Sequence, residues 1–244
     1  MTASSFEAGR LIWSDEFDGP AGSPPEPTRW LHETGGGGWG NREVQTYTAD
    51  PANASLDGRS SLVIRAARRG GDVTSARLIT KGRYEFEHGR IEARVQAPSG
   101  HGLWSAIWML GSDIDAASWP ACGEIDVMEV LGSEPHRVFG TVHCPGHSGK
   151  GGVSGAHISQ RPLSDGFRTY AVDWGPQAIT WSIDGRAYHS VSAGEIGASW
   201  VFDHPFYLLV NLAVGGSLGG PVDDGTALPA ELKLDYLRVY EPRR

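Results

Sequence analysis

The sequence has little cysteine, no long apolar run and no excess of positive charge. Cys122 and Cys144 are the only cysteines among 244 residues, too few for a disulfide framework or a zinc cluster. No segment has the roughly 18 consecutive apolar residues that a membrane-spanning helix requires. The formal net charge is -8, whereas nucleic-acid binding needs a basic face that meets the phosphates. The composition therefore argues against membrane insertion and against nucleic acid as a partner.

Signals of targeting and of division into domains are also missing. The N-terminus shows no basic region followed by an apolar stretch, so no signal peptide is visible. A secreted protein in its mature form would look the same. We expect residues 1–10 to form a loose leader and residues 1–244 to form a single domain, because all-β sandwiches of this length commonly do so.

Short alternating segments and glycine dominate what is present. The chain has 34 glycines, which suit many turns, and residues 91–97 alternate apolar and polar side chains as a half-exposed strand does. Asp184-Gly185 predicts a two-residue hairpin turn, and no segment predicts an amphipathic helix of three turns. This pattern predicts an all-β fold, a two-sheet antiparallel sandwich or jelly roll. We expect strands over residues 11–17, 61–67, 76–80, 83–87, 90–97, 103–110, 119–130, 138–144, 167–174, 178–183, 186–191, 206–214 and 231–240.

Two glycine-rich segments are expected to be loops. Residues 35–41 read Gly-Gly-Gly-Gly-Trp-Gly-Asn, and four consecutive glycines are costly to order, which suits a plain surface linker. Trp39 and Asn41 instead favour a loop at the border of a binding cleft. Residues 150–155 form the second glycine-rich segment.

One acidic segment stands out, with Glu124, Asp126 and Glu129 set among apolar residues. Burying an unpaired carboxylate costs several kcal/mol, so core strands normally avoid it. Alternation places Glu124 and Asp126 on one face of a strand, but it would send Glu129 to the other face. A β-bulge near Val127-Met128 would return Glu129 to the carboxylate face. We interpret this segment as a catalytic strand.

Paired carboxylates that flank a scissile bond are the usual apparatus of glycoside hydrolysis. A third carboxylate between them, Asp126, would help the acid to keep its proton, because a like charge disfavours ionisation. A calcium site or a solvated acidic face are the alternatives. Calcium prefers flexible loops with carbonyl ligands, and a solvated face would not explain the neighbouring Trp104, Trp108 and Trp119. The spacing alone does not choose between retention and inversion.

The segment after the acidic strand predicts its hairpin partner. Alternation there places Thr141 and His143 on one face and Val142 and Cys144 on the other. His143 would then face the carboxylates, although a half-buried structural histidine is the alternative. Because Cys122 shares its parity with Glu124, the two cysteines would point to opposite faces, which argues against a disulfide.

These residues resemble the laminarinase-type members of glycoside hydrolase family 16, the endo-β-1,3-glucanases. The segment 123–129, Gly-Glu-Ile-Asp-Val-Met-Glu, matches that family's E-x-D-x-x-E signature. Further matches run in order through nearly the whole chain, at residues 13–17, 38–45, 81–86, 89–94, 102–110, 211–216 and 235–240. Ser105 replaces the proline that is common in the family.

The resemblance implies a concanavalin A-like jelly roll with a concave substrate cleft, a retaining mechanism and no cofactor for the chemistry. Glu124 would be the nucleophile, Glu129 the general acid/base and Asp126 the residue that tunes them. The residues that would line the sugar subsites are Asn41, Arg83, Trp104, Trp108, Trp119 and His143. Many members hold a structural calcium ion, which would map to Glu16, Gly58 and Asp235.

The longer, bulged motif also bears on the substrate that the resemblance implies. Mixed-linkage lichenases of the family typically have E-x-D-x-E, so the longer form favours β-1,3-glucan, while agar and carrageenan hydrolases share it. We expect a monomeric, extracellular enzyme that acts on a neutral polysaccharide. A non-catalytic β-glucan-binding lectin on the same sandwich is the alternative from a different class.

Overall fold

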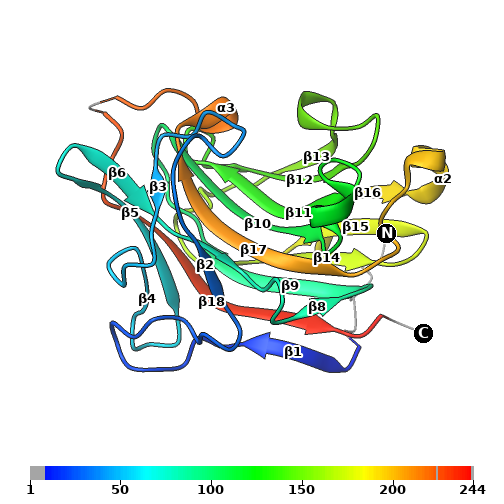
Figure 1. The fold of residues 1–244 in the computed structure, drawn as a ribbon, viewed down its shortest axis with the longest axis horizontal. Coiled ribbons are helices and arrows are strands. Elements are labelled where there is room, and N and C mark those ends of the chain that lie inside the picture. Colours follow the sequence, from blue (N-terminus) through cyan, green and yellow to red (C-terminus); the bar gives the residue numbers. More distant parts are fainter. Residues whose placement is uncertain (1–8, 224, 243–244) are drawn as a thin grey trace.

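The computed structural model describes residues 9–223 and 225–242, which fold into two packed β-sheets (Figure 1). Most of the expected leader lies outside the described residues. Arg10 is described, and its carbonyl accepts a hydrogen bond from the backbone of Glu241. Within the described part of the chain, no helix is long and apolar enough to cross a bilayer.

The larger sheet has ten strands and forms the outer, convex layer in Figure 1. Its spatial order is β16 (Arg186–Ser192), β15 (Ala178–Ile183), β14 (Arg168–Trp174), β9 (Gly89–Gln96), β18 (Ala230–Tyr240), β5 (Leu62–Arg69), β6 (Asp72–Ser75) and β3 (Thr46–Tyr47). Two further strands join this sheet: β1 (Leu11–Asp15) pairs with β18, and β4 (Ala54–Leu56) pairs with β5.

The second sheet has eight strands and lies on the concave side. Its order is β13 (Val153–Ile158), β12 (Arg137–His143), β11 (Glu124–Leu131), β10 (Leu103–Gly111), β17 (Phe206–Val214), β7 (Arg77–Ile79) and β2 (Leu31–Glu33), with β8 (Glu85–Phe86) against β17. Described strand pairs are antiparallel except for β3 with β6. The predicted two-sheet antiparallel sandwich is therefore confirmed.

Helix is confined to single turns in the described residues, as the lack of helical periodicity predicts. These are α1 (Ile114–Ala117), α2 (Ala193–Ile196) and α3 (Gly216–Gly219), with 3-10 turns at Gly149–Gly151 and Gly197–Ser199. Asp184 and Gly185 join β15 to β16 with φ of 47° and 75°, which are the positive values that a tight hairpin turn needs. The predicted hairpin is confirmed.

The expectation of a loop over residues 150–155 is wrong in its second half, because β13 begins at Val153. This edge strand contains Gly155 and has alternately half-buried and exposed residues, so its sequence carries little apolar signal. The sequence pattern also does not predict four short strands, β2, β3, β4 and β6. Each has two to four residues, too few to display a period.

The core lies between the two sheets and contains the inward side chains of both. Strand β10 contributes Leu103, Ile107 and Met109 to it, while Trp104 and Trp108 lie on the concave face in separate clusters. Cys144 belongs to this core and Cys122 to a cluster on the concave face. Both cysteines are free, as their opposite parity predicts.

Two glycines make room for two large rings at one end of this core. Gly140 on β12 pairs directly with Gly155 on β13, and Trp181 on β15 pairs with His189 on β16. The rings of Trp181 and His189 stack with centroids 4.9 Å apart. A Cβ atom at Gly140 would lie 2.2 Å from Trp181 Cδ1, and one at Gly155 would lie 2.2 Å from His189 Cγ. The stacked rings therefore pack directly against the two glycines.

We expect Gly140→Ala to destabilise the fold by about 1–3 kcal/mol, because the added methyl group overpacks this contact. Gly166→Ala is the control, since a Cβ there meets nothing within 4 Å. Urea unfolding measures the free energy of both variants. Equal stability of the two variants would contradict the packing described above.

Candidate active site

Strand β11 contains a bulge at the position that the parity of its carboxylates predicts. On one side, Met128 pairs with Ile107 and Asp126 pairs with Trp108, so that Val127 has no partner on β10. On the other side, Asp126 pairs with Thr141 and Glu129 with Phe139. Two residues of β11 thus face one residue of β12, which is the definition of a bulge.

The bulge divides β11 into an apolar face and an acidic face. Ile125, Val127, Met128 and Val130 all lie in the main core. Two consecutive core residues, Val127 and Met128, shift the alternation by one step and return Glu129 to the side of Glu124 and Asp126. Asp126 is only 3% exposed and Glu129 only 9% exposed, so these carboxyl groups are held largely out of water.

Two indole N–H groups fix the two glutamates. Trp119 Nε1 donates to Glu124 Oε2 at 2.7 Å, and Trp104 Nε1 donates to Glu129 Oε1 at 3.0 Å. The family resemblance predicted both tryptophans as residues that line the sugar subsites. Their role toward the carboxylates, as hydrogen-bond donors, was not predicted.

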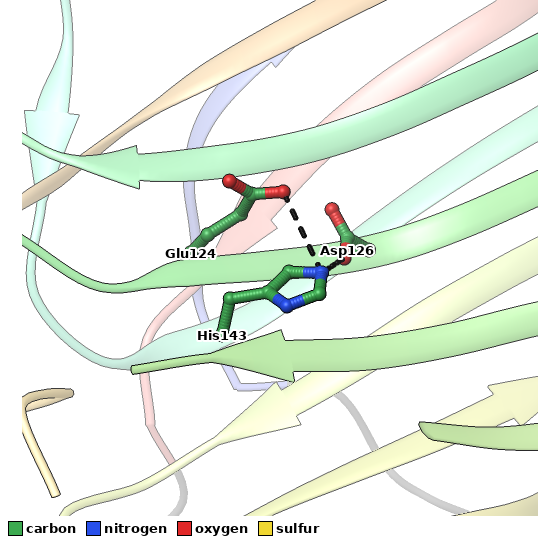
Figure 2. Close-up of side chains that lie close together, drawn as sticks. All are labelled: Glu124, Asp126 and His143. Atoms are coloured by element: carbon green, nitrogen blue, oxygen red, sulfur yellow. Dashed lines mark ion pairs between the residues drawn. The ribbon is translucent and has the colours of Figure 1, made fainter. Parts of the chain in front are cut away.

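His143 faces the carboxylates from the neighbouring strand, as Figure 2 shows. It pairs with Glu124 in the β11–β12 ladder. Its Nε2 lies 3.4 Å from Asp126 Oδ2 and 3.9 Å from Glu124 Oε1. Asp126 Oδ2 is buried and has no hydrogen-bond partner among the described residues, so the imidazole is the polar group placed to interact with it.

Burial raises the pKa of all three carboxyl groups. The pKa of Glu124 rises to about 8, first through desolvation and then through the charge of Asp126. Desolvation and the charge of Glu129 raise the pKa of Asp126 well above its usual range. Desolvation and the charge of Glu124 raise the pKa of Glu129 to about 7. The cluster therefore retains protons at neutral pH. Because the three carboxyl groups interact, the pKa values that an experiment measures describe the whole cluster.

This arrangement can supply both a proton and a negative charge to one bound molecule. Carboxyl groups that share protons in a buried site are suited to general acid and nucleophile roles at one scissile bond. Sequence comparison agrees with the geometry: residues 40–236 match the family model of glycosyl hydrolases family 16. The chain belongs to this family.

Relatives of this family 16 chain resemble it along nearly its full length. It is 40% identical over 243 residues to a β-glucanase of Rhodothermus marinus, covering 94% of this chain and 84% of the relative. The structure of an endo-β-1,3-glucanase from Pyrococcus furiosus superimposes with a TM-score of 0.89 at 41% identity, covering 96% of this chain and 94% of that one. The laminarinase catalytic domain of Thermotoga maritima gives a TM-score of 0.90 at 39% identity, with 98% and 100% covered.

The family 16 chain also has an arginine in its concave sheet that the sequence analysis missed. The guanidinium of Arg77, on β7, lies 4.7 Å from the ring of Trp39 and 4.7 Å from the ring of Trp108, and its Nε forms an ion pair with Glu33. The guanidinium of Arg77 thus contacts and holds two tryptophan rings, one from the glycine-rich loop and one from β10. The only available signal was a charged residue within an otherwise apolar segment.

The glycine-rich loop is anchored by a polar network centred on Glu43. The carboxylate of Glu43 accepts hydrogen bonds from Asn41, Gln45 and Tyr47. Tyr47 in turn accepts from Asn211, whose Oδ1 accepts the indole N–H of Trp108 at 2.8 Å. The loop is therefore tied to β10 and β17, which supports the interpretation of a cleft border over that of a plain linker.

Arg83 is placed differently from expectation. It lies exposed in the turn between β7 and β8, directly after Gly82, whose φ is 68°. The structure brings Arg77, and not Arg83, to the tryptophans, because Arg77 precedes that turn and extends from the sheet itself.

The residues predicted for calcium have other partners. Both oxygens of Glu16 accept hydrogen bonds from Arg238, at 2.9 and 2.6 Å, and Asp235 accepts from Arg94 at 2.6 Å. Gly58 lies in the loop between β4 and β5 with φ of 77°. Calcium is bound by carboxylate and carbonyl oxygens, and here guanidinium groups engage both carboxylates. The calcium site stays a prediction.

We expect Arg77→Leu to raise KM about tenfold, because loss of the two cation–π contacts releases both tryptophan rings. Arg83→Leu is the matched control and should leave KM nearly unchanged. Steady-state kinetics on a soluble glucan measures both. A larger effect at Arg83 than at Arg77 would contradict the placement of these residues.

We expect Glu129→Gln to flatten the dependence of stability on pH. The folded-state pKa of Glu129, about 7, lies above the value of about 4.3 for an unfolded glutamate. Its contribution to stability is thus fully present below pH about 4.3 and is lost as pH rises through about 7. Thermal unfolding of wild type and variant between these values measures the difference. Glu134→Gln, in the turn after β11, is the control, and parallel curves for wild type and Glu129→Gln would contradict the burial of this proton.

Proposed function

We propose that this chain is a retaining endo-β-1,3-glucanase. The observation that carries the proposal is the bulged strand β11, which presents two glutamates, each held by an indole N–H, on either side of a buried aspartate. Similarity to named endo-β-1,3-glucanases and laminarinases over nearly the whole chain supports the substrate class.

In the first step, Glu129 donates its proton to the glycosidic oxygen while Glu124 attacks the anomeric carbon. The glycosidic bond breaks, and the sugar is held as an ester of Glu124. In the second step, Glu129 takes a proton from water, the water oxygen bonds to the anomeric carbon and Glu124 leaves. Two inversions retain the configuration.

The raised pKa of Glu129, about 7, leaves this carboxyl group partly protonated near neutral pH, as an acid must be. Glu124 must be ionised to attack. Burial and the charge of Asp126 raise the pKa of Glu124 to about 8, above that of Glu129. The assignment of the two roles therefore follows the order of the glutamates in the family's E-x-D-x-x-E signature, and not their pKa values. The indole N–H of Trp119 and the imidazole of His143 then stabilise the carboxylate of Glu124.

The substrate-facing surface follows from the same geometry. Neutral sugar rings would stack on exposed indole faces, of which Trp119 offers the largest, at 45% exposure. We propose that Asn41, Trp104, Trp108 and His143 also line the subsites, with Arg77 in the place expected for Arg83. An agar hydrolase and a non-catalytic lectin are the competing functions, and a lectin gains nothing from two glutamates set beside a buried aspartate.

The chemistry of a glycoside hydrolase needs no cofactor, and the described carboxyl groups suffice for it. A structural calcium ion at Glu16, Gly58 and Asp235 would require Arg238 and Arg94 to release their partners. We further propose that the chain acts outside the cell, because a polymeric glucan does not cross membranes. We also propose that it acts as a monomer, because the residues assigned to the site all lie on one chain.

The test is release of reducing ends from laminarin, curdlan, barley mixed-linkage glucan and agarose. We expect the highest initial rate on a β-1,3-glucan, and losses of at least about a thousandfold for Glu124→Gln and Glu129→Gln. The control, Glu134→Gln, retains activity. Binding of laminarin without release would favour the lectin, and a preference for agarose would overturn the substrate assignment.

The stereochemistry is tested separately by NMR of the first product. We expect the β-anomer from the wild type, and azide should restore glycosyl transfer to Glu124→Gly with an α-glycosyl azide as product. An initial α-anomer from the wild type would rule out the retaining mechanism.

A further inference from the structure

A residue of the opposite sheet contacts the catalytic strand at its bulge. Trp181 lies on β15 and is fully buried. Its Nε1 crosses the core and donates to the main-chain carbonyl of Asp126 at 2.7 Å. This carbonyl is the first one before the unpaired residue Val127, so the hydrogen bond is made at the point where β11 leaves its regular register.

The contact fixes the peptide plane between Asp126 and Val127. A bulge rotates the local backbone out of the regular ladder, and a buried carbonyl needs a donor wherever it then points. The indole supplies that donor from a position fixed by its own surroundings. It stacks on His189 and lies against Gly140, the single residue of β12 that faces the bulge.

We infer that Trp181 is a positioning residue for hydrolysis. By holding the carbonyl of Asp126 toward the core, it keeps the Asp126 side chain beside His143 and directs Val127 and Met128 inward. Glu129 is then returned to the face of Glu124. Gly140 takes part by admitting the indole, since any side chain there would occupy the position of its ring. This inference rests on the proposed function for its kinetic test, but not for its spectroscopic one.

Trp174 provides a matched control. It is also a buried tryptophan of the same sheet, on β14, and its Nε1 donates to a main-chain carbonyl, that of Phe202, at 2.9 Å. Trp174→Phe and Trp181→Phe therefore remove the same kind of hydrogen bond from the same core. Only the second removes it from the catalytic strand.

For Trp181→Phe we expect kcat on laminarin to fall between about tenfold and a hundredfold, which is the usual effect of misplacing catalytic groups by about 1 Å. KM should change less than about threefold, because the tryptophans of the concave face are untouched. Trp174→Phe should keep kcat within about threefold of the wild-type value. Its loss of thermal stability should be similar to that of Trp181→Phe. Equal kcat values for the two folded variants would overturn the inference.

Replacing Trp181 by benzothienylalanine, in which sulfur takes the place of the indole N–H, covers the case in which Trp181→Phe fails to fold. This substitution preserves the shape of the ring and should reproduce the loss of kcat. Unchanged kcat with benzothienylalanine at position 181 would overturn the role of the hydrogen bond.

A readout without substrate separates this inference from the proposed function. The side-chain carboxyl carbons of Asp and Glu are labelled with carbon-13, and their NMR signals are followed as pH changes. The pH dependence of the Asp126 and Glu129 signals should change in Trp181→Phe and should match the wild type in Trp174→Phe. If the wild type releases no sugar, the proposed function fails, while the titration still decides whether Trp181 positions the cluster. If the signals of both carboxyl groups in Trp181→Phe titrate as they do in the wild type, the positioning role of Trp181 is overturned.

Discussion

The exclusion of water from three neighbouring carboxyl groups is the constraint on which the rest of the structure depends. Strand β11 buries one face completely in the core, so a regular strand would force Glu129 into an apolar interior. Burying one unpaired carboxylate there would cost several kcal/mol. The bulge at Val127 and Met128 avoids this cost by sending two apolar residues inward in succession. The resulting acidic face concentrates charge, and proton retention by the cluster is the consequence.

A bulge of this kind needs support that its own sheet does not provide. Strand β12 faces the bulge with a glycine, and a glycine alone would leave a void beneath β11. The ring of Trp181 fills that space from the opposite sheet, with His189 stacked against it and Gly155 beneath His189. The two layers of the sandwich are therefore not interchangeable: one presents the carboxyl groups, and the other determines the backbone path that presents them.

Sequence reasoning succeeded where a strict period was involved. The two-residue repeat of strands located the bulge, placed Thr141 and His143 opposite the carboxylates and separated Cys122 from Cys144. It failed where a role depends on residues distant in sequence. The apolar segment around Arg77 is the only local difference from Arg83, and it does not reveal that Arg77 contacts one ring from a loop and one from β10. The two arginines that neutralise Glu16 and Asp235 were missed for the same reason. Gly155 was read as loop because its function, admitting His189, is defined by the other sheet.

The partners of the acidic residues show how one side-chain type acquires opposite properties in this fold. Glu16 accepts two hydrogen bonds from the guanidinium of Arg238, and this contact lowers its pKa. Glu129 accepts from the indole of Trp104, a donor without net charge. An indole N–H satisfies the carboxyl oxygen and fixes its position, yet it is too weak to offset the desolvation that raises the pKa. An arginine in the place of Trp104 would hold Glu129 just as firmly but would strip it of its proton near neutral pH. Tryptophan at position 104 therefore combines a fixed position of the Glu129 carboxyl group with a retained proton, which is the combination that the proposed acid requires.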